Sequence, residues 1–125
     1  MGDEKPLTAA HVVLVEDSAL LGDAFRIMLE RAGFRVSVAA SVAQALLVPD
    51  RADLLLLDVS LPDGDGMTLL TRLADVGRAP PVSIALTGHD DPATRSRCIR
   101  AGCADVIVKP IPMSELVGRV RALLD

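Results

Sequence analysis

The segment Leu54–Asp58, with the sequence LLLLD, determines how the rest of this chain is arranged. Four consecutive leucines bounded by polar residues are typical of a strand buried on both faces, as at the centre of a parallel sheet. In open parallel sheets, ligands bind just beyond the carboxyl ends of the strands. The pattern therefore predicts that Asp58 stands at the functional edge of a sheet, with a Pro-, Gly- and Asp-rich turn over 59–66 behind it.

Strand-like and helix-like segments alternate on both sides of this strand. The other strands are predicted over 11–15, 34–38, 82–86 and 104–108, and helices over 19–32, 42–48, 67–76 and 92–101, with a last helix that starts at 112 or 114 and runs to 124. Ser18, Ser41 and Asp91 precede three of the helices as N-cap residues. A strand followed by a helix, five times over, predicts an α/β fold with one parallel sheet and helices on both faces.

Length and composition narrow the class of protein. The chain has 125 residues, which predicts one domain over 11–125 after a polar lead-in over 1–10. The net charge of −4 and the absence of Trp and Tyr argue against direct binding of nucleic acid. Neither a signal sequence nor a membrane span is predicted, so we expect a cytoplasmic monomer or weak dimer. Cys98 and Cys103 match no zinc spacing and are expected to be small, partly buried hydrophobic residues.

Polar residues collect where the predicted strands end. Glu16 and Asp17 follow the first strand, Asp58 ends the third, Thr87 follows the fourth and Lys109 follows the fifth. Parallel strands end at one edge, so three carboxylates are expected to lie together and to repel one another. A hard divalent cation with oxygen ligands would relieve this repulsion. Mg²⁺ is the simplest choice, and Mn²⁺ is an alternative.

This set of side chains suits phosphoryl transfer. A carboxylate such as Asp58 can act as a nucleophile and form an acyl phosphate. A metal ion and Lys109 would neutralise charge on the transferring group, and the Thr87 hydroxyl would donate a hydrogen bond to a phosphoryl oxygen.

The ordered motifs Glu16-Asp17, Asp58, Thr87 and Lys109-Pro110, each at a predicted strand end, resemble the receiver domain of bacterial two-component response regulators. The resemblance covers residues 10–124. It implies a flavodoxin-like (βα)5 doubly wound fold with strand order 2-1-3-4-5. It also implies a phosphorylation-dependent signalling module rather than an enzyme, although such a domain supports its own phosphorylation and autodephosphorylation.

The resemblance also implies roles for individual residues. Asp58 would accept phosphate from a histidine kinase or a histidine phosphotransfer protein. The metal ligands would be Glu16, Asp17, Asp58 and the backbone carbonyl of Ser60. Lys109 would pair with the phosphoryl group, and its peptide bond to Pro110 would be cis.

The output side of the site follows from the same resemblance. Thr87 would move toward the phosphate and change the face formed by the fourth helix, the fifth strand and the fifth helix, where an unknown downstream protein would bind. Ser60 and His89, each two residues beyond a site residue, would set the dephosphorylation rate. Arg95, Arg97 and Arg100 give the fourth helix a basic side, which predicts a solvated surface or a docking face for an acidic partner.

Two positions depart from the family pattern. Val106 stands where the family usually has an aromatic ring that moves with the threonine, so the usual aromatic switch is absent here. Glu16 stands where Asp is commoner, and its longer side chain should still reach a metal ion. The segments 87–88 and 101–105 are similar to receivers attached to hybrid sensor kinases, although a single-domain regulator is also consistent with the sequence.

Other functions fit less well. A haloacid-dehalogenase-type hydrolase needs a second Asp two residues beyond the nucleophile, where this chain has Ser60. A nucleotide or flavin binder on this fold needs a phosphate-binding loop after the first strand, where Glu16 and Asp17 would repel phosphate. The alternative that stays open is a degenerate receiver acting as a phosphorylation-independent protein-binding scaffold, which Val106 favours and the complete acidic set opposes.

Overall fold

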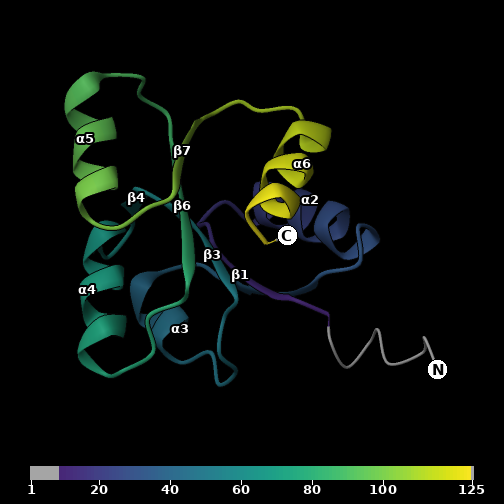
Figure 1. Ribbon diagram of the computed structural model, residues 1–125, viewed down its shortest axis with the longest axis horizontal. Coiled ribbons are helices and arrows are strands. Elements are labelled where there is room, and N and C mark those ends of the chain that lie inside the picture. Colours follow the sequence, from purple (N-terminus) through teal and green to yellow (C-terminus); the bar gives the residue numbers. More distant parts are fainter. Residues whose placement is uncertain (1–8, 125) are drawn as a thin grey trace.

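The structure is a computed structural model that describes residues 9–124, and it forms a parallel sheet between two layers of helices (Figure 1). The strands of the main sheet are β1 (His11–Val15), β2 (Arg35–Ala39), β3 (Leu54–Asp58), β6 (Val82–Thr87) and β7 (Asp105–Val108). Their order is β2-β1-β3-β6-β7, and every neighbouring pair is parallel. The predicted strand order 2-1-3-4-5 is therefore confirmed. Most of the predicted lead-in over 1–10 and residue 125 lie outside the described residues.

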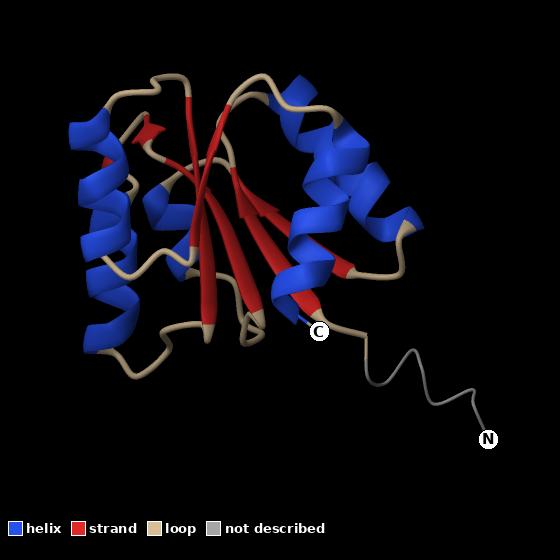
Figure 2. Cartoon of the chain, turned by 45° about the horizontal axis from the view of Figure 1, so that its top comes forward, coloured by secondary structure: helices blue, strands red, loops and turns tan. Residues whose placement is uncertain are grey.

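The helices are placed on both faces of the sheet, as the alternating pattern predicts. They are α2 (Ala19–Arg31), α3 (Val42–Leu46), α4 (Met67–Asp75), α5 (Pro92–Arg100) and α6 (Met113–Leu124). Helices α3, α4 and α5 lie on one side of the sheet, and α2 and α6 lie on the other (Figures 1 and 2). This is the doubly wound arrangement expected from the sequence.

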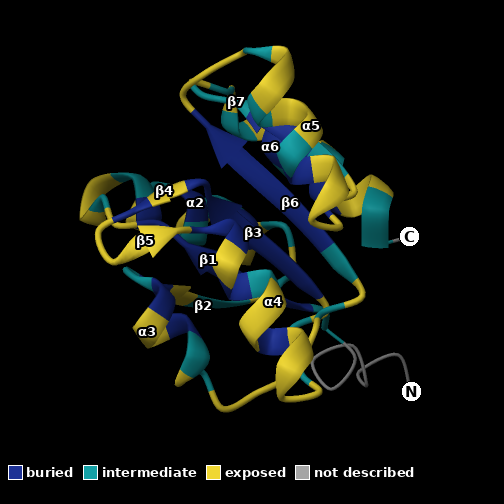
Figure 3. Ribbon diagram, turned by 90° about the vertical axis from the view of Figure 1, so that its left-hand side faces the viewer, coloured by how far each residue is buried: buried dark blue, intermediate teal, exposed yellow. Residues whose placement is uncertain are grey.

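Strand β3 shows why an uninterrupted apolar run is needed at the centre of the sheet. All five of its residues are buried (Figure 3). Leu55 and Leu57 pack into the core beneath α3, α4 and α5, whereas Leu54 and Leu56 pack into the core beneath α2 and α6. Successive side chains of a strand point to opposite faces, so a strand covered on both faces requires an apolar residue at every position.

The predicted N-caps begin three helices. The Ser18 hydroxyl accepts from Leu21 N at 3.2 Å, and the Ser41 hydroxyl accepts from Gln44 N at 3.1 Å. The Asp91 carboxylate accepts from Thr94 N at 3.2 Å, and Pro92 occupies the first turn. These bonds satisfy backbone N–H groups that have no partner inside the helix.

Several elements begin or end one residue away from the predicted position, and α3 and the turn over 59–66 differ by more. Strand β2 begins at Arg35 rather than at residue 34, because its parallel register pairs Arg35 with His11. Helix α3 ends at Leu46 rather than at 48, where the Arg78 guanidinium binds the carbonyls of Leu46 and Val48. The predicted turn over 59–66 contains a short antiparallel pair, β4 (Ser60–Leu61) and β5 (Gly64–Asp65), since Gly64 has a φ of 140° that permits a tight reversal.

His11 is a buried structural residue, a role that the sequence pattern does not reveal. Its side chain is 1% exposed at the start of β1. Nδ1 is 2.9 Å from the carbonyl of Arg51, and Nε2 is 2.7 Å from the hydroxyl of Ser37. The backbone N–H of His11 also donates to Asp53 at 2.7 Å. His11 therefore fastens the segment before β3 to the first two strands.

Candidate functional site

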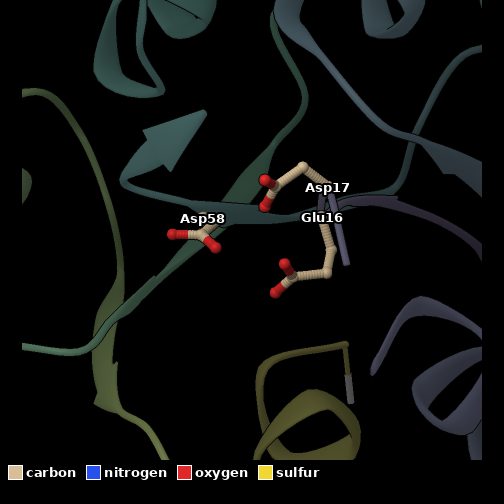
Figure 4. Close-up of side chains that lie close together, drawn as sticks. All are labelled: Glu16, Asp17 and Asp58. Atoms are coloured by element: carbon tan, nitrogen blue, oxygen red, sulfur yellow. The ribbon is translucent and has the colours of Figure 1, made fainter. Parts of the chain in front are cut away.

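Three carboxylates meet at the carboxyl edge of the sheet. Glu16 and Asp17 follow β1, Asp58 ends β3, and one oxygen of each lies within 4.8 Å of the others. The close-up shows the three side chains near one another (Figure 4). Glu16 and Asp58 are buried and Asp17 is exposed, so the cluster opens to solvent on one side. The structure thus brings together the three carboxylates that the sequence predicts at this edge.

Lys109 supplies the compensating charge within the cluster. Its ammonium group donates to Asp58 Oδ2 at 2.9 Å and to Glu16 Oε1 at 3.3 Å. The Lys109 side chain is 22% exposed, whereas those of Glu16 and Asp58 are 2% and 8% exposed. Two nearly buried carboxylates therefore share one cation, in a setting where an unpaired charge would be costly. The Lys109–Pro110 peptide bond is cis.

The environment shifts the proton affinities of Glu16 and Lys109. Burial raises the pKa of Glu16, and the charge of Asp58 adds to the effect, against the opposing hydrogen bond from Ser18 N and the charge of Lys109. Burial alone would lower the pKa of Lys109. The hydrogen bond to Asp58 and the charges of Asp58 and Glu16 together outweigh burial, so the pKa of Lys109 lies above its ordinary value. Lys109 is therefore a fixed cation at neutral pH.

Hydrogen bonds and close packing fix the position of the main chain around Asp58. The backbone N–H of Ser60 donates to Asp58 Oδ1 at 3.0 Å, which orients the carboxylate. Gly66 N donates to the carbonyl of Val59 at 2.8 Å, and a Cβ on Gly66 would overlap the carbonyl oxygen of Asp58. Only glycine fits at this point of the loop, a requirement that was not predicted from the sequence.

Thr87 is the last residue of β6, and its side chain forms hydrogen bonds with the loop that follows. The residue is 3% exposed. Its Oγ1 accepts from His89 N at 3.1 Å and lies 3.4 Å from the carbonyl of His89. No hydrogen bond joins Thr87 to the acidic cluster among residues 9–124. His89 itself is exposed.

Val106 and the two cysteines belong to the core. Val106 is 3% exposed and lies in the same buried cluster as Cys98 and Cys103. Burial raises the pKa of Cys98 and raises that of Cys103 to about 12, so both thiols stay protonated at neutral pH. Both cysteines are free and buried.

Two aspartates of the turn behind Asp58 have structural roles that the sequence left undefined. Asp63 accepts from Val42 N at 2.9 Å and Ala43 N at 3.0 Å, and so caps α3 together with Ser41. These bonds hold the pKa of Asp63 below its ordinary value. Asp65 forms an ion pair with Arg97 of α5. An Asp-Gly-Asp-Gly pattern signals a turn, but it does not show which distant groups the carboxylates reach.

The acidic cluster has the donor set for a small hard cation. Mg²⁺ prefers carboxylate oxygens and retains several water ligands, which a cluster open to solvent on one side allows. Glu16, Asp17 and Asp58 fit such an ion. The partly buried Lys109 beside them could neutralise a further anionic group at Asp58. The three carboxylates and Lys109 thus have the charges needed to hold a cation and, beside it, an anion.

Comparison with known proteins identifies the class to which this site belongs. Residues 12–121 match the family described as "Response regulator receiver domain". This chain belongs to that family. A receiver domain is a phosphoacceptor signalling module, and the predicted family and fold are therefore confirmed.

Curated relatives share the receiver region. The chain is 39% identical over 115 residues to the response regulator protein PmrA of Pseudomonas aeruginosa, covering 90% of this chain and 52% of that protein. It is 34% identical over 116 residues to the TorCAD operon transcriptional regulatory protein TorR of Escherichia coli, covering 91% and 50%. The chain thus spans about half the length of these relatives.

Solved structures show the same fold. A CheY-like receiver domain protein from Methanospirillum hungatei JF-1 has a TM-score of 0.84 at 25% identity, with 94% of each chain covered. The BeF3-activated receiver domain of Klebsiella pneumoniae RstA has a TM-score of 0.81 at 30% identity, with 91% of this chain and 97% of that one covered. Within residues 9–124, no helix combines the length and apolar character needed to cross a membrane.

Proposed function

We propose that this chain is a phosphorylation-dependent switch in which Asp58 accepts a phosphoryl group from a phosphohistidine. The observation that carries the proposal is the placement of Asp58 beside two further carboxylates and the partly buried Lys109. If Asp58 only capped a helix or loop at the surface, it would need neither the neighbouring cation nor the second buried carboxylate. The degenerate scaffold is disfavoured for the same reason, because two nearly buried carboxylates are costly to retain without a use.

The transfer exchanges one bond to phosphorus for another. An Asp58 oxygen attacks phosphorus, the bond from phosphorus to the histidine nitrogen breaks, and the leaving nitrogen keeps the electron pair. The product is an acyl phosphate on Asp58. The Ser60 N–H orients the carboxylate through its hydrogen bond to Oδ1. Lys109 then pairs with the phosphoryl group through the ammonium that now binds Asp58 Oδ2.

The metal ligands that we propose are Glu16, Asp17, Asp58 and the backbone carbonyl of Ser60. When bound, Mg²⁺ supplies positive charge beside the transferring phosphoryl oxygens. Mn²⁺ has the same preference for oxygen ligands and should substitute for it. Glu16 reaches the cluster despite its extra methylene, because its other oxygen accepts from Ser18 N at 3.1 Å and fixes the side chain.

A docking site for the phosphodonor adjoins Asp58. An apolar cleft is lined by Leu21, Phe25, Lys109, Pro110, Ile111 and Met113. Leu20, which precedes Leu21 of this cleft at the start of α2, is 82% exposed and is therefore accessible to a protein that packs on α2. Because Lys109 joins this cleft to Asp58, we propose that the histidine-bearing helix of a kinase or phosphotransfer protein packs here. Leu20→Glu should weaken transfer from such a protein and leave labelling by a small phosphodonor unchanged.

On the output side, we propose that phosphorylation changes the face formed by α5, β7 and α6. Phosphorylation adds a charge of about −2 beside Thr87 and Lys109. It can shift a two-state equilibrium only through contacts that differ between the states. The Thr87 hydroxyl now binds the 87–89 loop, and its exchange onto a phosphoryl oxygen would provide such a difference.

The proposal is tested by incubating the protein with Mg²⁺ and acetyl phosphate and measuring the intact mass. The parent should gain one phosphoryl group, and Asp58→Asn should gain none. A chelator control should abolish the gain. Equal gains in the parent and in Asp58→Asn would refute the assignment of Asp58, and no gain with either acetyl phosphate or a phosphohistidine donor would favour the scaffold.

A further inference from the structure

We propose that Arg97 is a positioning residue that holds the loop behind Asp58 through its ion pair with Asp65. When a phosphoryl group is bound at Asp58, this ion pair passes the resulting change in the loop to helix α5. Arg97 lies on α5 and its guanidinium binds Asp65 Oδ2, a contact that spans 32 positions of the sequence. The inference rests on the proposed function, because it concerns how the occupied phosphoacceptor site is sensed. It is carried by a continuous series of contacts from Asp58 to α5.

The first link joins Asp58 to Gly66. The backbone of Gly66 lies against Asp58 so closely that a Cβ would overlap the Asp58 carbonyl oxygen and crowd the Leu57 side chain at 2.9 Å. Gly66 N also donates to the Val59 carbonyl at 2.8 Å. Such close packing transmits displacement, because neither backbone can move toward the other. A shift of the Asp58 main chain therefore moves Gly66 and the adjoining residue, Asp65.

The second link fixes the Asp65 carboxylate to the start of α4. Asp65 Oδ1 accepts from Met67 N at 2.9 Å, and the Asp65 carbonyl accepts from the Thr68 hydroxyl at 2.7 Å. The second carboxylate oxygen extends away from its own turn and binds Arg97. The acceptor presented to α5 thus has a position set by the loop behind Asp58.

The third link is Arg97, which differs from the other arginines of α5. Arg95 pairs with Asp90, in the loop that leads into its own helix. Arg100 lines an open surface cleft with Arg95, Ser96 and Ile99. Among residues 9–124, the Arg97–Asp65 pair is the only ion pair between α5 and the segment 59–66. The predicted common basic side of this helix is therefore divided between different partners.

Residue 106 of β7 offers no second polar connection between the loop behind Asp58 and α5. Val106 has an apolar side chain and is buried with Cys98 and Cys103. The core contacts beside it include Cys103 Sγ and Met67 Sδ, 3.9 Å apart, which is a weak and adaptable interaction. The specific polar contact between this loop and α5 is therefore the exposed Arg97–Asp65 ion pair.

Because the Arg97–Asp65 pair is exposed, its effect on signalling can be measured without a large effect on the stability of the fold. The side chains of Arg97 and Asp65 are 41% and 42% exposed, and exposed ion pairs contribute little to folding. Arg97→Gln should therefore fold normally. Coupling between two sites is a separate quantity from stability and is measured by the response of one site to occupancy of the other.

The experiment uses beryllofluoride with Mg²⁺ as the phosphoryl mimic at Asp58 and records amide chemical shifts of the ¹⁵N-labelled chain. In the parent, saturation should shift amides near Asp58 and also those of α5, including Ile99. In Arg97→Gln the shifts near Asp58 should persist, whereas those of α5 should fall by about half or more. Arg97→Lys, which keeps a cation, should restore them, and Arg100→Gln is the matched control that should behave as the parent.

Asp65→Asn provides a second, independent arm. The amide oxygen of Asn can still accept from Met67 N, but the anion is lost. Asp65→Asn should reproduce Arg97→Gln, and the double variant should add nothing, because both changes remove one interaction. Unchanged α5 shifts in Arg97→Gln, or additive losses in the double variant, would overturn the coupling while leaving Asp58 binding intact. A parent that shows no beryllofluoride response near Asp58 would overturn the proposed function, and this inference with it.

Discussion

The ammonium group of Lys109 lies 2.9 Å from Asp58 Oδ2, and this contact joins the ends of β7 and β3 across the carboxyl edge of the sheet. The same ammonium lies 3.3 Å from Glu16 Oε1. One cation therefore holds two nearly buried carboxylates in place. The site is assembled by the sheet, since each of the three residues lies at or next to the end of a different strand.

Removing Lys109 should make the protein depend on a metal ion for stability. Lys109→Ala leaves Glu16 and Asp58 facing each other without a cation, and an unpaired buried charge costs about 1–3 kcal/mol or more. We expect a lower Tm without metal and a larger rise in Tm on adding Mg²⁺ than in the parent. Thermal unfolding by circular dichroism, with and without Mg²⁺, measures both. An equal Mg²⁺ response in parent and variant would contradict the shared-cation account.

Two glycine substitutions should have opposite effects. Gly66→Ala places a methyl group on the Asp58 carbonyl, and such overpacking typically costs about 1–3 kcal/mol. Gly118 lies inside α6 and faces open space where a Cβ would stand, so Gly118→Ala should stabilise the helix by about 0.5–1 kcal/mol. Denaturant unfolding gives both values. Acetyl phosphate labelling should slow in Gly66→Ala and stay unchanged in Gly118→Ala; a tolerated Gly66→Ala would refute the close contact.

The cap formed by Asp63 should be lost in acid. Its hydrogen bonds from Val42 N and Ala43 N lower its pKa in the folded state, so the unfolded chain binds a proton more readily. The stabilisation is therefore present above the unfolded pKa of about 3.9 and disappears as pH falls through the folded value. Asp63→Asn should lower Tm at about pH 6, and the difference from the parent should shrink toward about pH 3. A difference independent of pH would show that the charge of Asp63 does not matter.

Ser60 and His89 should set the lifetime of the phosphorylated state. Ser60 adjoins Asp58 through its N–H bond, and His89 N binds Thr87 Oγ1, so both residues border the phosphoacceptor site. Replacing both with Ala should change the phosphate half-life several-fold while Asp58 still accepts one phosphoryl group, because the backbone hydrogen bonds of residues 60 and 89 remain. The decay of phosphorylated protein after removal of the donor measures this. An unchanged half-life would exclude both side chains from the path of the attacking water.

The residues at the carboxyl edge of the sheet are predictable from the sequence, because each apolar strand ends at a recognisable polar residue. Each strand carries a run of aliphatic residues, and a polar residue at its end must lie at the carboxyl edge once the strands are parallel. For this reason the strand-end positions of Glu16, Asp17, Asp58, Thr87 and Lys109 were predicted correctly.

Contacts between turns and distant elements were not predictable in this way. His11 binds Arg51 and Ser37, and Asp65 binds Arg97, across 26 to 40 positions of the chain. Hydrophobic periodicity specifies which face of an element is buried, but it carries no information on which polar partner a side chain meets across a loop. The sequence also does not show that residue 66 must be glycine, because this requirement comes from a contact with the backbone of Asp58.

The central claim is that Asp58 itself becomes an acyl phosphate. The most direct test is to label the protein with acetyl phosphate and Mg²⁺, reduce it with borohydride, and map the peptides by mass spectrometry. Borohydride converts an aspartyl phosphate to homoserine, so the account predicts homoserine at position 58 and unmodified aspartate at positions 17, 63 and 65. Homoserine at another aspartate, or a phosphoryl group that survives on a serine or threonine, would contradict it.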